Sequence, residues 1–367
     1  MKYLLLILLC AVDVTINAVP NDKRAHGQNG WYIPVTEESF EWVDKDNVDT
    51  YLENVRKKYM EMNNSDSLDR RNIFFPQNDV FFHLYTNKNQ VHSQLITIDK
   101  RSIDSSYFNP AHPTRISIHG FNSGPDGFIN YGVRDAWLSK GDYNYIFVEW
   151  NAARYSNYAM VVTCLKHVAF DVGNLIDFLA QNNYIKLEEL VMVGHSLGAH
   201  IVGFSARSFH NIKTIIGLDP ASPLIKDNCE DRLCHKDAKY VESIHTNGGN
   251  FGYLTPIGRG SFYPNGGQSQ PACPWYQKFI GICDHSMAIK YYAEAIQLND
   301  FPSIKCKSYE DAIHKRCGKQ LTAVRMGGMG DTDSISGVYY VPVSAKIPYG
   351  VPPGTVVNVQ IHETELK

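Results

Sequence analysis

The sequence has no strong excess of charge of either sign. Its 367 residues include 35 Lys and Arg against 38 Asp and Glu, which gives a net charge of −3. Proteins that bind nucleic acid usually present a basic surface, so no nucleic-acid partner is expected. Internal repeats and low-complexity tracts are also missing. With 44% hydrophobic residues, the chain can build a large core.

No apolar run reaches the roughly 20 residues that a membrane-spanning helix needs. An apolar run at residues 3–12 follows Lys2 and leads into a more polar stretch that ends near Ala18. This pattern predicts a signal peptide over residues 1–18, and therefore a secreted, extracellular protein. The alternative, a membrane anchor, is disfavoured because the run is too short.

The cysteines lack the Cys-x-x-Cys spacing of structural zinc sites. One cysteine falls in the predicted signal peptide, and Cys164 lies in a helical pattern that predicts a buried free thiol. The other six form close sequential pairs and predict three local disulfides in an oxidising compartment. These pairs are Cys229–Cys234, Cys273–Cys283 and Cys306–Cys317.

Residues 19–71 are polar and show little strand or helix pattern before a charged, weakly helical stretch at 48–62. Asn63 begins an Asn-Asn-Ser glycosylation sequon, so this region is expected to be exposed. Residues 19–71 are interpreted as an N-terminal extension or a propeptide, and residues 72–367 as the folded domain. A dibasic pair, Arg70-Arg71, is consistent with removal of the extension, but an extension that stays attached is equally compatible with the sequence.

Strand and helix patterns alternate from Val80 onward. The predicted strands are 80–85, 93–98, 115–119, 143–150, 190–193, 214–218 and 240–245, and the predicted helices include 160–180 and 285–297. This alternation predicts an α/β fold with a mostly parallel central sheet flanked by helices, and with a hairpin formed by the first two strands at its edge. The run 248–274 carries no regular pattern, and the tail after Lys319 is predicted to form β hairpins.

The most informative stretch is a sharp passage from strand to helix. The apolar run 190–193 meets Gly-His-Ser-Leu-Gly, with Ser196 in the middle, and an apolar helix pattern follows at once. This arrangement is typical of a nucleophile elbow, in which two glycines leave room for a turn that lifts the serine hydroxyl out of the sheet. His195 and His200 are interpreted as an elbow packing residue and a helix-surface residue.

A serine hydroxyl needs a base and a carboxylate that orients the base. In the α/β-hydrolase fold these follow in the order serine, acid, histidine. Asp219 comes directly after the strand that follows the elbow, and His285 lies at the start of a late helix, so both fit this order. The rival candidates are His245 as the base and Asp237 or Asp284 as the acid.

The same chemistry requires an oxyanion hole made by two backbone N–H groups. One candidate is the amide of Leu197, directly after the nucleophile. The second is the amide of Phe121, because it lies in the loop after the strand that ends at His119-Gly120. Gly120 could also be a simple turn residue.

Several linked motifs resemble the pancreatic lipase family, in particular its insect members and the wasp-venom phospholipases A1. They are GHSLGAH at Ser196, GLDPA at Asp219, HGF at Phe121, IHT followed by FYPNGG at 262–267, and the 283–292 segment with Cys-x-His and KYY. The likeness covers about residues 75–345. It implies an α/β-hydrolase fold without a cofactor, a Ser196–Asp219–His285 triad, and an oxyanion hole at Phe121 and Leu197.

Departures from the family pattern carry further expectations. Too few residues follow the catalytic domain for the C-terminal β-sandwich of vertebrate digestive lipases, so no colipase partner is expected. The lid would be the Cys273–Cys283 loop, with only nine residues between the cysteines, and the preceding loop, 248–260, is also short. In the family, short versions of both loops resemble phospholipases A1 rather than triacylglycerol lipases.

The calcium site of the family is not expected here. Arg232 and Asp237 match it, but Cys234 stands where a ligand carboxylate would be. Because of this departure from the family pattern no metal is expected, and the Cys229–Cys234 bridge is expected to order the loop instead.

The lid sequence is unusually apolar for a short solvated loop. Aromatic side chains with polar edges favour a membrane or micelle interface, and Lys278 could contact anionic headgroups. The alternative is that the apolar residues pack over the core. The lid residues concerned are Trp275, Tyr276, Lys278, Phe279 and Ile280.

These expectations together favour a secreted serine hydrolase of lipid esters. The leading hypothesis is a phospholipase A1 that releases the sn-1 fatty acid while it is bound peripherally to a lipid surface. The first alternative is a neutral triacylglycerol or galactolipid lipase of the digestive tract. The second is a non-catalytic lipid binder like the yolk proteins, which lack the serine; it is disfavoured because all three triad positions are filled here.

Overall fold

The computed structural model describes residues 24–34, 40–64, 80–277, 281–328, 330 and 332–351. In this part of the chain the main sheet has ten strands, in the order β11-β12-β10-β9-β8-β7-β5-β6-β3-β4. Its strands are β3 (Val80–Tyr85), β4 (Gln94–Ile96), β5 (Thr114–Ile118), β6 (Asn144–Trp150), β7 (Val191–His195), β8 (Thr214–Leu218), β9 (Tyr240–Ile244), β10 (Gly260–Pro264), β11 (Ile304–Cys306) and β12 (Gly337–Val341).

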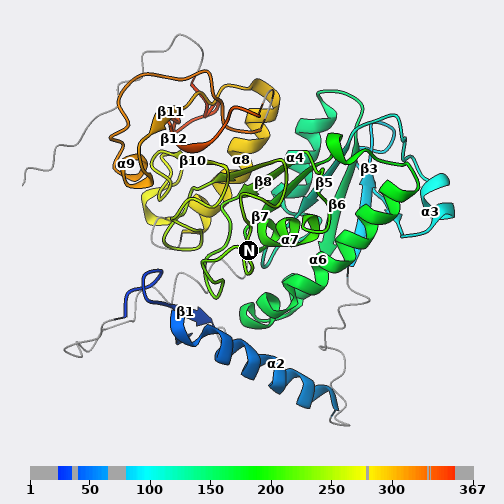
Figure 1. Ribbon diagram of the computed structural model, residues 1–367, viewed down its shortest axis with the longest axis horizontal. Coiled ribbons are helices and arrows are strands. Elements are labelled where there is room, and N and C mark those ends of the chain that lie inside the picture. Colours follow the sequence, from blue (N-terminus) through cyan, green and yellow to red (C-terminus); the bar gives the residue numbers. More distant parts are fainter. Residues whose placement is uncertain are drawn as a thin grey trace, which may run out of the picture.

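Helices cover both faces of this sheet (Figure 1). The described helices are α2 (Val48–Asn64), α3 (Lys100–Asp104), α4 (Phe128–Leu138), α5 (Ala152–Tyr155), α6 (Tyr158–Gln181), α7 (Leu197–Ala206), α8 (Ile282–Leu298) and α9 (Tyr309–Ile313), with short 3-10 turns at Lys45–Asn47, Leu187–Glu189 and Trp275–Gln277. The α6–α7 pair packs in one apolar layer with the sheet, and the α4–α8 pair packs in the other. The sheet is therefore buried on both faces, as parallel sheets are.

The centre of the sheet is parallel, as the alternating pattern predicts. Strands β6, β5, β7, β8, β9 and β10 run in one direction. At one edge β3 and β4 pair antiparallel, which confirms the predicted edge hairpin. Because the carboxyl ends of the parallel strands share one edge, the residues that follow β5, β7 and β8 lie together there.

Three expectations about secondary structure are wrong. The patternless run 248–274 contains β10, a short, fully buried strand between glycines and prolines, which periodicity does not reveal. The tail after Lys319 forms no hairpin in its described part: β12 pairs parallel with β10 and antiparallel with β11. The extension also contains the hairpin β1–β2 (Gly30–Pro34 and Phe40–Asp44) ahead of α2.

Helix α6 is the one helix in the described ranges that is long and apolar enough to cross a membrane. The structure gives another reason for its composition. Thirteen of its residues are buried, and it packs between α2 and α7. A helix that is buried on several sides is apolar on several sides, so α6 is a core helix.

A buried glutamate makes the stability of the fold depend on pH. Glu242 on β9 is fully buried, accepts hydrogen bonds from Tyr240 Oη at 2.8 Å and Gly327 N at 2.6 Å, and burial raises its pKa to about 7. The folded protein thus holds this proton more tightly than the unfolded chain. The free energy of unfolding should fall by about 3 kcal/mol between pH 4.5 and 7 through this group.

Urea unfolding at several pH values tests this expectation. Glu242→Gln should flatten the pH dependence between pH 5 and 7 relative to the wild-type protein, whereas Glu188→Gln, at an exposed position, should leave it unchanged. An equal slope in both variants would show that Glu242 does not titrate in this range.

Candidate active site

Ser196 lies on the predicted elbow between β7 and α7. Its φ of 58° and ψ of −124° are strained for a residue with a side chain, and its N–H donates to Leu218 O on β8 at 3.0 Å. The two flanking glycines are needed for close packing. A Cβ on Gly194 would lie 2.2 Å from Gly198 O, and one on Gly198 would lie 2.3 Å from Ile118 O. The local sequence therefore forces the serine to the carboxyl edge of the sheet.

The loop after β5 passes directly beside this serine. A Cβ on Gly120 would lie 2.6 Å from Ser196 Cβ, so only glycine fits here. Gly120 is therefore more than a simple turn residue, because it lets the loop approach the serine. Phe121 follows, and Leu197 opens α7, where the first N–H groups have no acceptor inside the helix. Both candidate oxyanion amides thus belong to segments next to Ser196.

A histidine that sequence reasoning did not single out holds this loop. Trp150 N donates to His119 Nε2 at 3.3 Å, Trp150 Nε1 donates to His119 O at 3.0 Å, and His119 Nδ1 bonds Gly120 O at 2.9 Å. Burial lowers the pKa of His119 to about 4, so the ring stays neutral. His119 is therefore a positioning residue. The sequence signals were the place of His119 in the HGF motif and the tryptophan at the end of the β6 pattern, but neither indicated that the two residues are in contact.

Asp219 and His285, 66 positions apart in the sequence, meet at the same edge. His285 Nδ1 donates to Asp219 Oδ2 at 2.5 Å, and Asp219 Oδ1 accepts N–H bonds from Thr246 at 2.7 Å and Asn247 at 3.0 Å. The carboxylate is fully buried. Such an arrangement orients the imidazole and leaves its Nε2 as the atom that can accept a proton.

The imidazole of His285 lies against the elbow. The His195 and His285 rings are 4.5 Å apart, and His195 Nε2 bonds His285 O at 3.1 Å, so His195 packs at the elbow as predicted. Within the described residues no hydrogen bond joins Ser196 Oγ to His285. Catalytic hydrogen bonds of this kind are often long or poorly aligned without substrate.

The rival residues are engaged elsewhere. His245 bonds Tyr253 O at 2.7 Å and Ser243 Oγ at 2.9 Å, which occupies both of its ring nitrogens. Asp284 accepts from Gln270 N at 2.5 Å, and Asp237 pairs with Arg207 at 3.1 Å. The structure therefore brings together Asp219 and His285 rather than any rival pair.

His200 is not at the helix surface, so that interpretation is wrong. It is fully buried, accepts from Leu233 N at 3.0 Å and donates to Ala221 O at 2.7 Å. Burial lowers its pKa to about 4. The neutral ring joins α7 to the loop just beyond Asp219, a role that only the packing of α7 on its neighbours reveals.

The loop after β8 is organised by hydrogen bonds from the Arg207 side chain. Arg207 donates to Asp237 and to the carbonyls of Cys229, Glu230 and Arg232, at 2.6 to 3.1 Å. The other Asp237 oxygen accepts from the backbone N–H of residue 234 at 2.8 Å. These oxygens do not fit the calcium site of the family, because the Arg207 guanidinium already donates hydrogen bonds to the oxygens that would bind the ion.

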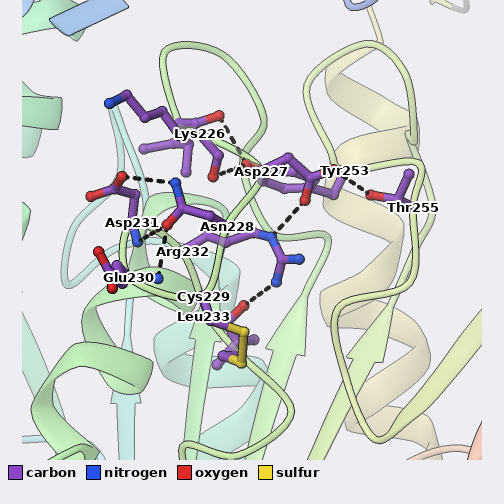
Figure 2. A network of polar contacts seen from close by, with 12 residues as sticks. Lys226, Asp227, Asn228, Cys229, Glu230, Asp231, Arg232, Leu233, Tyr253 and Thr255 are labelled. Atoms are coloured by element: carbon purple, nitrogen blue, oxygen red, sulfur yellow. Dashed lines mark hydrogen bonds and ion pairs between the residues drawn. A yellow bond between two sulfur atoms is a disulfide. The ribbon is translucent and has the colours of Figure 1, made fainter.

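Other contacts in the same loop strengthen this ordering. Arg232 donates to Asp227 and to Leu233 O, both at 2.8 Å, and Tyr253 Oη reaches Lys226 O at 3.0 Å (Figure 2). Among the described residues, the group Cys229, Cys234 and His235 has a spacing suited to a metal. Both sulfurs are consumed by a disulfide, so they offer no thiolate.

The remaining cysteines also follow the predicted pairing. Disulfides join Cys273–Cys283 and Cys306–Cys317. Cys164 is buried and free, and burial raises the pKa of its thiol to about 12, so it is unreactive.

Two of the predicted interface residues, Trp275 and Tyr276, lie in the described part of the lid. Trp275 is 75% exposed and Tyr276 is 55% exposed, so in the described part of the lid the aromatic side chains do not pack over the core. Residues 278–280, with Lys278, Phe279 and Ile280, lie outside the described residues, as do residues 1–18. Asn63 falls in the last turn of α2, and its glycosylation stays a prediction.

Comparison with known proteins extends these findings beyond the motifs. The model of the Lipase family matches residues 51–349. Probable phospholipase A1 magnifin of Vespa magnifica is 32% identical over 283 residues, which cover 72% of this chain and 82% of that protein. Pancreatic triacylglycerol lipase of Mus musculus is 31% identical over 260 residues, which cover 64% of this chain and 56% of the mouse protein.

Solved structures with lower similarity were also found. Est1E from Butyrivibrio proteoclasticus, with ferulic acid bound, is 15% identical, covers 59% of this chain and 92% of that chain, and has a TM-score of 0.34. The family model, in contrast, spans most of the chain and includes the elbow, Asp219 and His285. The chain therefore belongs to the pancreatic lipase family.

Proposed function

We propose that the protein is a secreted phospholipase A1, which hydrolyses the sn-1 ester of phospholipids at a lipid surface. It is a carboxylic ester hydrolase by family. The observation that carries the proposal is the Asp219–His285 contact beside the strained Ser196, because it supplies an oriented base next to a raised hydroxyl. The three disulfides support an extracellular location.

The chemistry follows from these groups. His285 Nε2 takes the proton of Ser196 Oγ, which attacks the ester carbonyl carbon. The amides of Phe121 and Leu197 donate hydrogen bonds to the carbonyl oxygen as negative charge develops on it. The tetrahedral intermediate collapses, the lysophospholipid leaves with the proton from His285, and an acyl-serine remains. Water, deprotonated by His285, then releases the fatty acid and restores the serine.

The short lid supports the phospholipid preference. The Cys273–Cys283 disulfide closes a loop of nine intervening residues, and the sequence resemblance links a lid of this length to phospholipases A1. A loop so short covers little of the surface around Ser196, so a bulky, charged headgroup can remain in water while the sn-1 chain enters. Trp275 and Tyr276 are suited to the boundary between headgroups and acyl chains.

A paired substrate assay tests the proposal. The protein should hydrolyse phosphatidylcholine labelled at sn-1 at least about tenfold faster than triolein, a difference that corresponds to about 1.4 kcal/mol in transition-state binding. The lysophospholipid product should keep its sn-2 chain. Faster hydrolysis of triolein, or release of the sn-2 chain first, would reject the phospholipase A1 assignment and leave the neutral lipase that the mouse relative suggests.

A further inference from the structure

The N-terminal segment packs across the active-site edge of the sheet. We call residues 24–34 and 40–64 the strap; it consists of β1, β2 and α2. In Figure 1 the strap lies below the loops that connect the parallel strands, and α2 diverges from α6 toward the right of the view. It contacts three places, and each follows the carboxyl end of a strand: β6, β8 or β9.

The first contact is with the loop after β9, residues 247–252. Gly27 approaches Gly249 so closely that a Cβ on Gly27 would lie 2.2 Å from the Gly249 carbonyl oxygen. The ring of His26 faces the backbone of Asn250. The same loop supplies the amide of residue 247 to Asp219, and its Phe251 ring lies 5.6 Å from the ring of His285. The strap therefore rests on the loop that holds the acid and the base.

The second contact is with the segment after β6. Strand β1 packs against α6, which begins at Tyr158, and α2 contacts the same helix. Trp31 and Ile33 of β1 are only 2% and 1% exposed and belong to the same apolar cluster as Tyr158 and Phe121. The rings of Phe121 and Tyr158 are 5.2 Å apart. The buried face of the hairpin thus belongs to the same apolar layer of the sheet as Tyr158 and the candidate oxyanion residue.

The third contact is electrostatic. Asp49, in the first turn of α2, pairs with Lys226 in the loop after β8. Both side chains are partly exposed, at 74% and 37%, so the pair contributes little stability by itself. It links the first turn of α2 to the loop that follows Asp219.

These contacts have a consequence for a lipid substrate. An isolated two-stranded hairpin is barely stable in water, so β1 and β2 depend on the apolar surface that they cover. The strap also contacts the loop after β9, and that loop contacts Asp219 and His285. Ser196 is only 7% exposed and the His285 side chain only 14% exposed at this edge. An acyl chain that approaches the serine needs the same apolar surface, and the strap and the lipid therefore compete for it.

We propose that the strap is an inhibitory segment, which covers the lipid-binding face at the active-site edge and keeps the enzyme latent until it is displaced. The inference rests on the proposed function, since it assumes an acyl-chain substrate. If the strap is closed in about 90% or more of the molecules, the reactivity of Ser196 falls about tenfold or more, because only open molecules react.

Variants of the full chain test this inference. The double variant Trp31→Ala/Ile33→Ala removes the buried face of β1, and Gly27→Val introduces a clash with Gly249. A third variant carries a site-specific protease site after Ser67, so that the strap is tied to the rest only by its contacts once it is cut. Each should be labelled by a fluorophosphonate about tenfold faster or more than the wild-type protein, and each should bind phosphatidylcholine vesicles more strongly in flotation.

The Asp49–Lys226 pair offers a matched control. Asp49→Lys sets two positive charges against each other and should speed labelling, and Lys226→Asp should do so by the same mechanism. The double exchange Asp49→Lys/Lys226→Asp restores an ion pair and should restore slow labelling. General damage to the fold would not be repaired by a second charge reversal.

The outcomes separate the two proposals. Folded, strap-released variants that label at the wild-type rate or more slowly would overturn the inhibitory strap. If the Trp31→Ala/Ile33→Ala variant does not fold, the labelling rate of the protein cut after Ser67 tests the inference, because its sequence around β1 is intact. Labelling is independent of the lipid class, so faster labelling together with a preference for triolein would keep the strap and reject the phospholipase A1 assignment.

Discussion

Replacement of Ser196 by alanine is expected to lower kcat/KM for lipid ester hydrolysis by about 10⁴- to 10⁶-fold. The variant loses the only oxygen on the elbow that can form the acyl-enzyme. His285 and the two candidate amides remain, so a residual rate above that in water is expected from oxyanion stabilisation and substrate binding. The backbone should not change, because the elbow is held by the Gly194–Gly198 contact and by the bond from the residue 196 amide to Leu218 O.

The measurement combines hydrolysis of labelled phosphatidylcholine with fluorophosphonate labelling. Ser196→Ala should abolish labelling altogether. Ser205→Ala is a matched control, since Ser205 lies on the same helix and its hydroxyl donates to Ile201 O at 2.7 Å. It should keep labelling and activity within about threefold of the wild-type protein. Retention of more than about 1% of activity by the Ser196 variant would show that another residue is the nucleophile.

Replacement of Asp219 by asparagine is expected to reduce kcat by about 10⁴-fold with little change in KM. The carboxylate accepts from two backbone N–H groups on one oxygen and from His285 Nδ1 on the other. An amide offers a single acceptor oxygen. That oxygen would accept the two backbone N–H bonds, and the NH₂ group of the asparagine would then face His285 Nδ1. The imidazole would adopt the wrong tautomer, with its proton on Nε2, and could not accept the serine proton.

The rival acid provides the comparison. Asp284→Asn removes the carboxylate next to His285 in the sequence, but this group bonds Gln270 N rather than the imidazole. Its kcat should therefore fall by no more than about tenfold, even if the variant is less stable. Steady-state assays of both variants, with circular dichroism to show that each is folded, decide the matter. A larger loss in Asp284→Asn than in Asp219→Asn would reverse the assignment.

The elbow could be predicted from the sequence because its cause is local. Five residues around Ser196 contain the two glycines that permit the turn, and an apolar strand and an apolar helix flank them. The position of Asp219 follows almost as directly. It comes after the next parallel strand, β8, and the carboxyl ends of neighbouring parallel strands meet at one edge.

The supporting contacts could not be predicted because they depend on residues far apart in the chain. His119 and Trp150 are neighbours only because β5 pairs with β6. His200 was wrongly predicted to lie at the helix surface, because the sequence of an apolar helix does not show which segments pack against the histidine. The buried β10 was missed for a related reason, since a short strand buried on both faces has no alternation of polar and apolar residues.

The N-terminal extension shows the same limit most clearly. Its polar composition was compatible with a removable propeptide, yet Trp31 and Ile33 are among the most buried residues of the protein. Two apolar side chains in a polar stretch form no pattern by themselves. They become informative only when the surface that covers them is known, and here that surface lies beside the catalytic edge.

Short segments of the chain thus determined the reactive residues and their local geometry. These are a serine on a tight turn, an aspartate after a strand, and three pairs of cysteines. The choice among competing histidines and aspartates, and the place where the first residues come to rest, required the folded molecule. The reason is physical. Turns and strand ends depend on steric limits within a few residues, whereas a hydrogen-bond partner or a covering surface depends on how the whole chain closes in space.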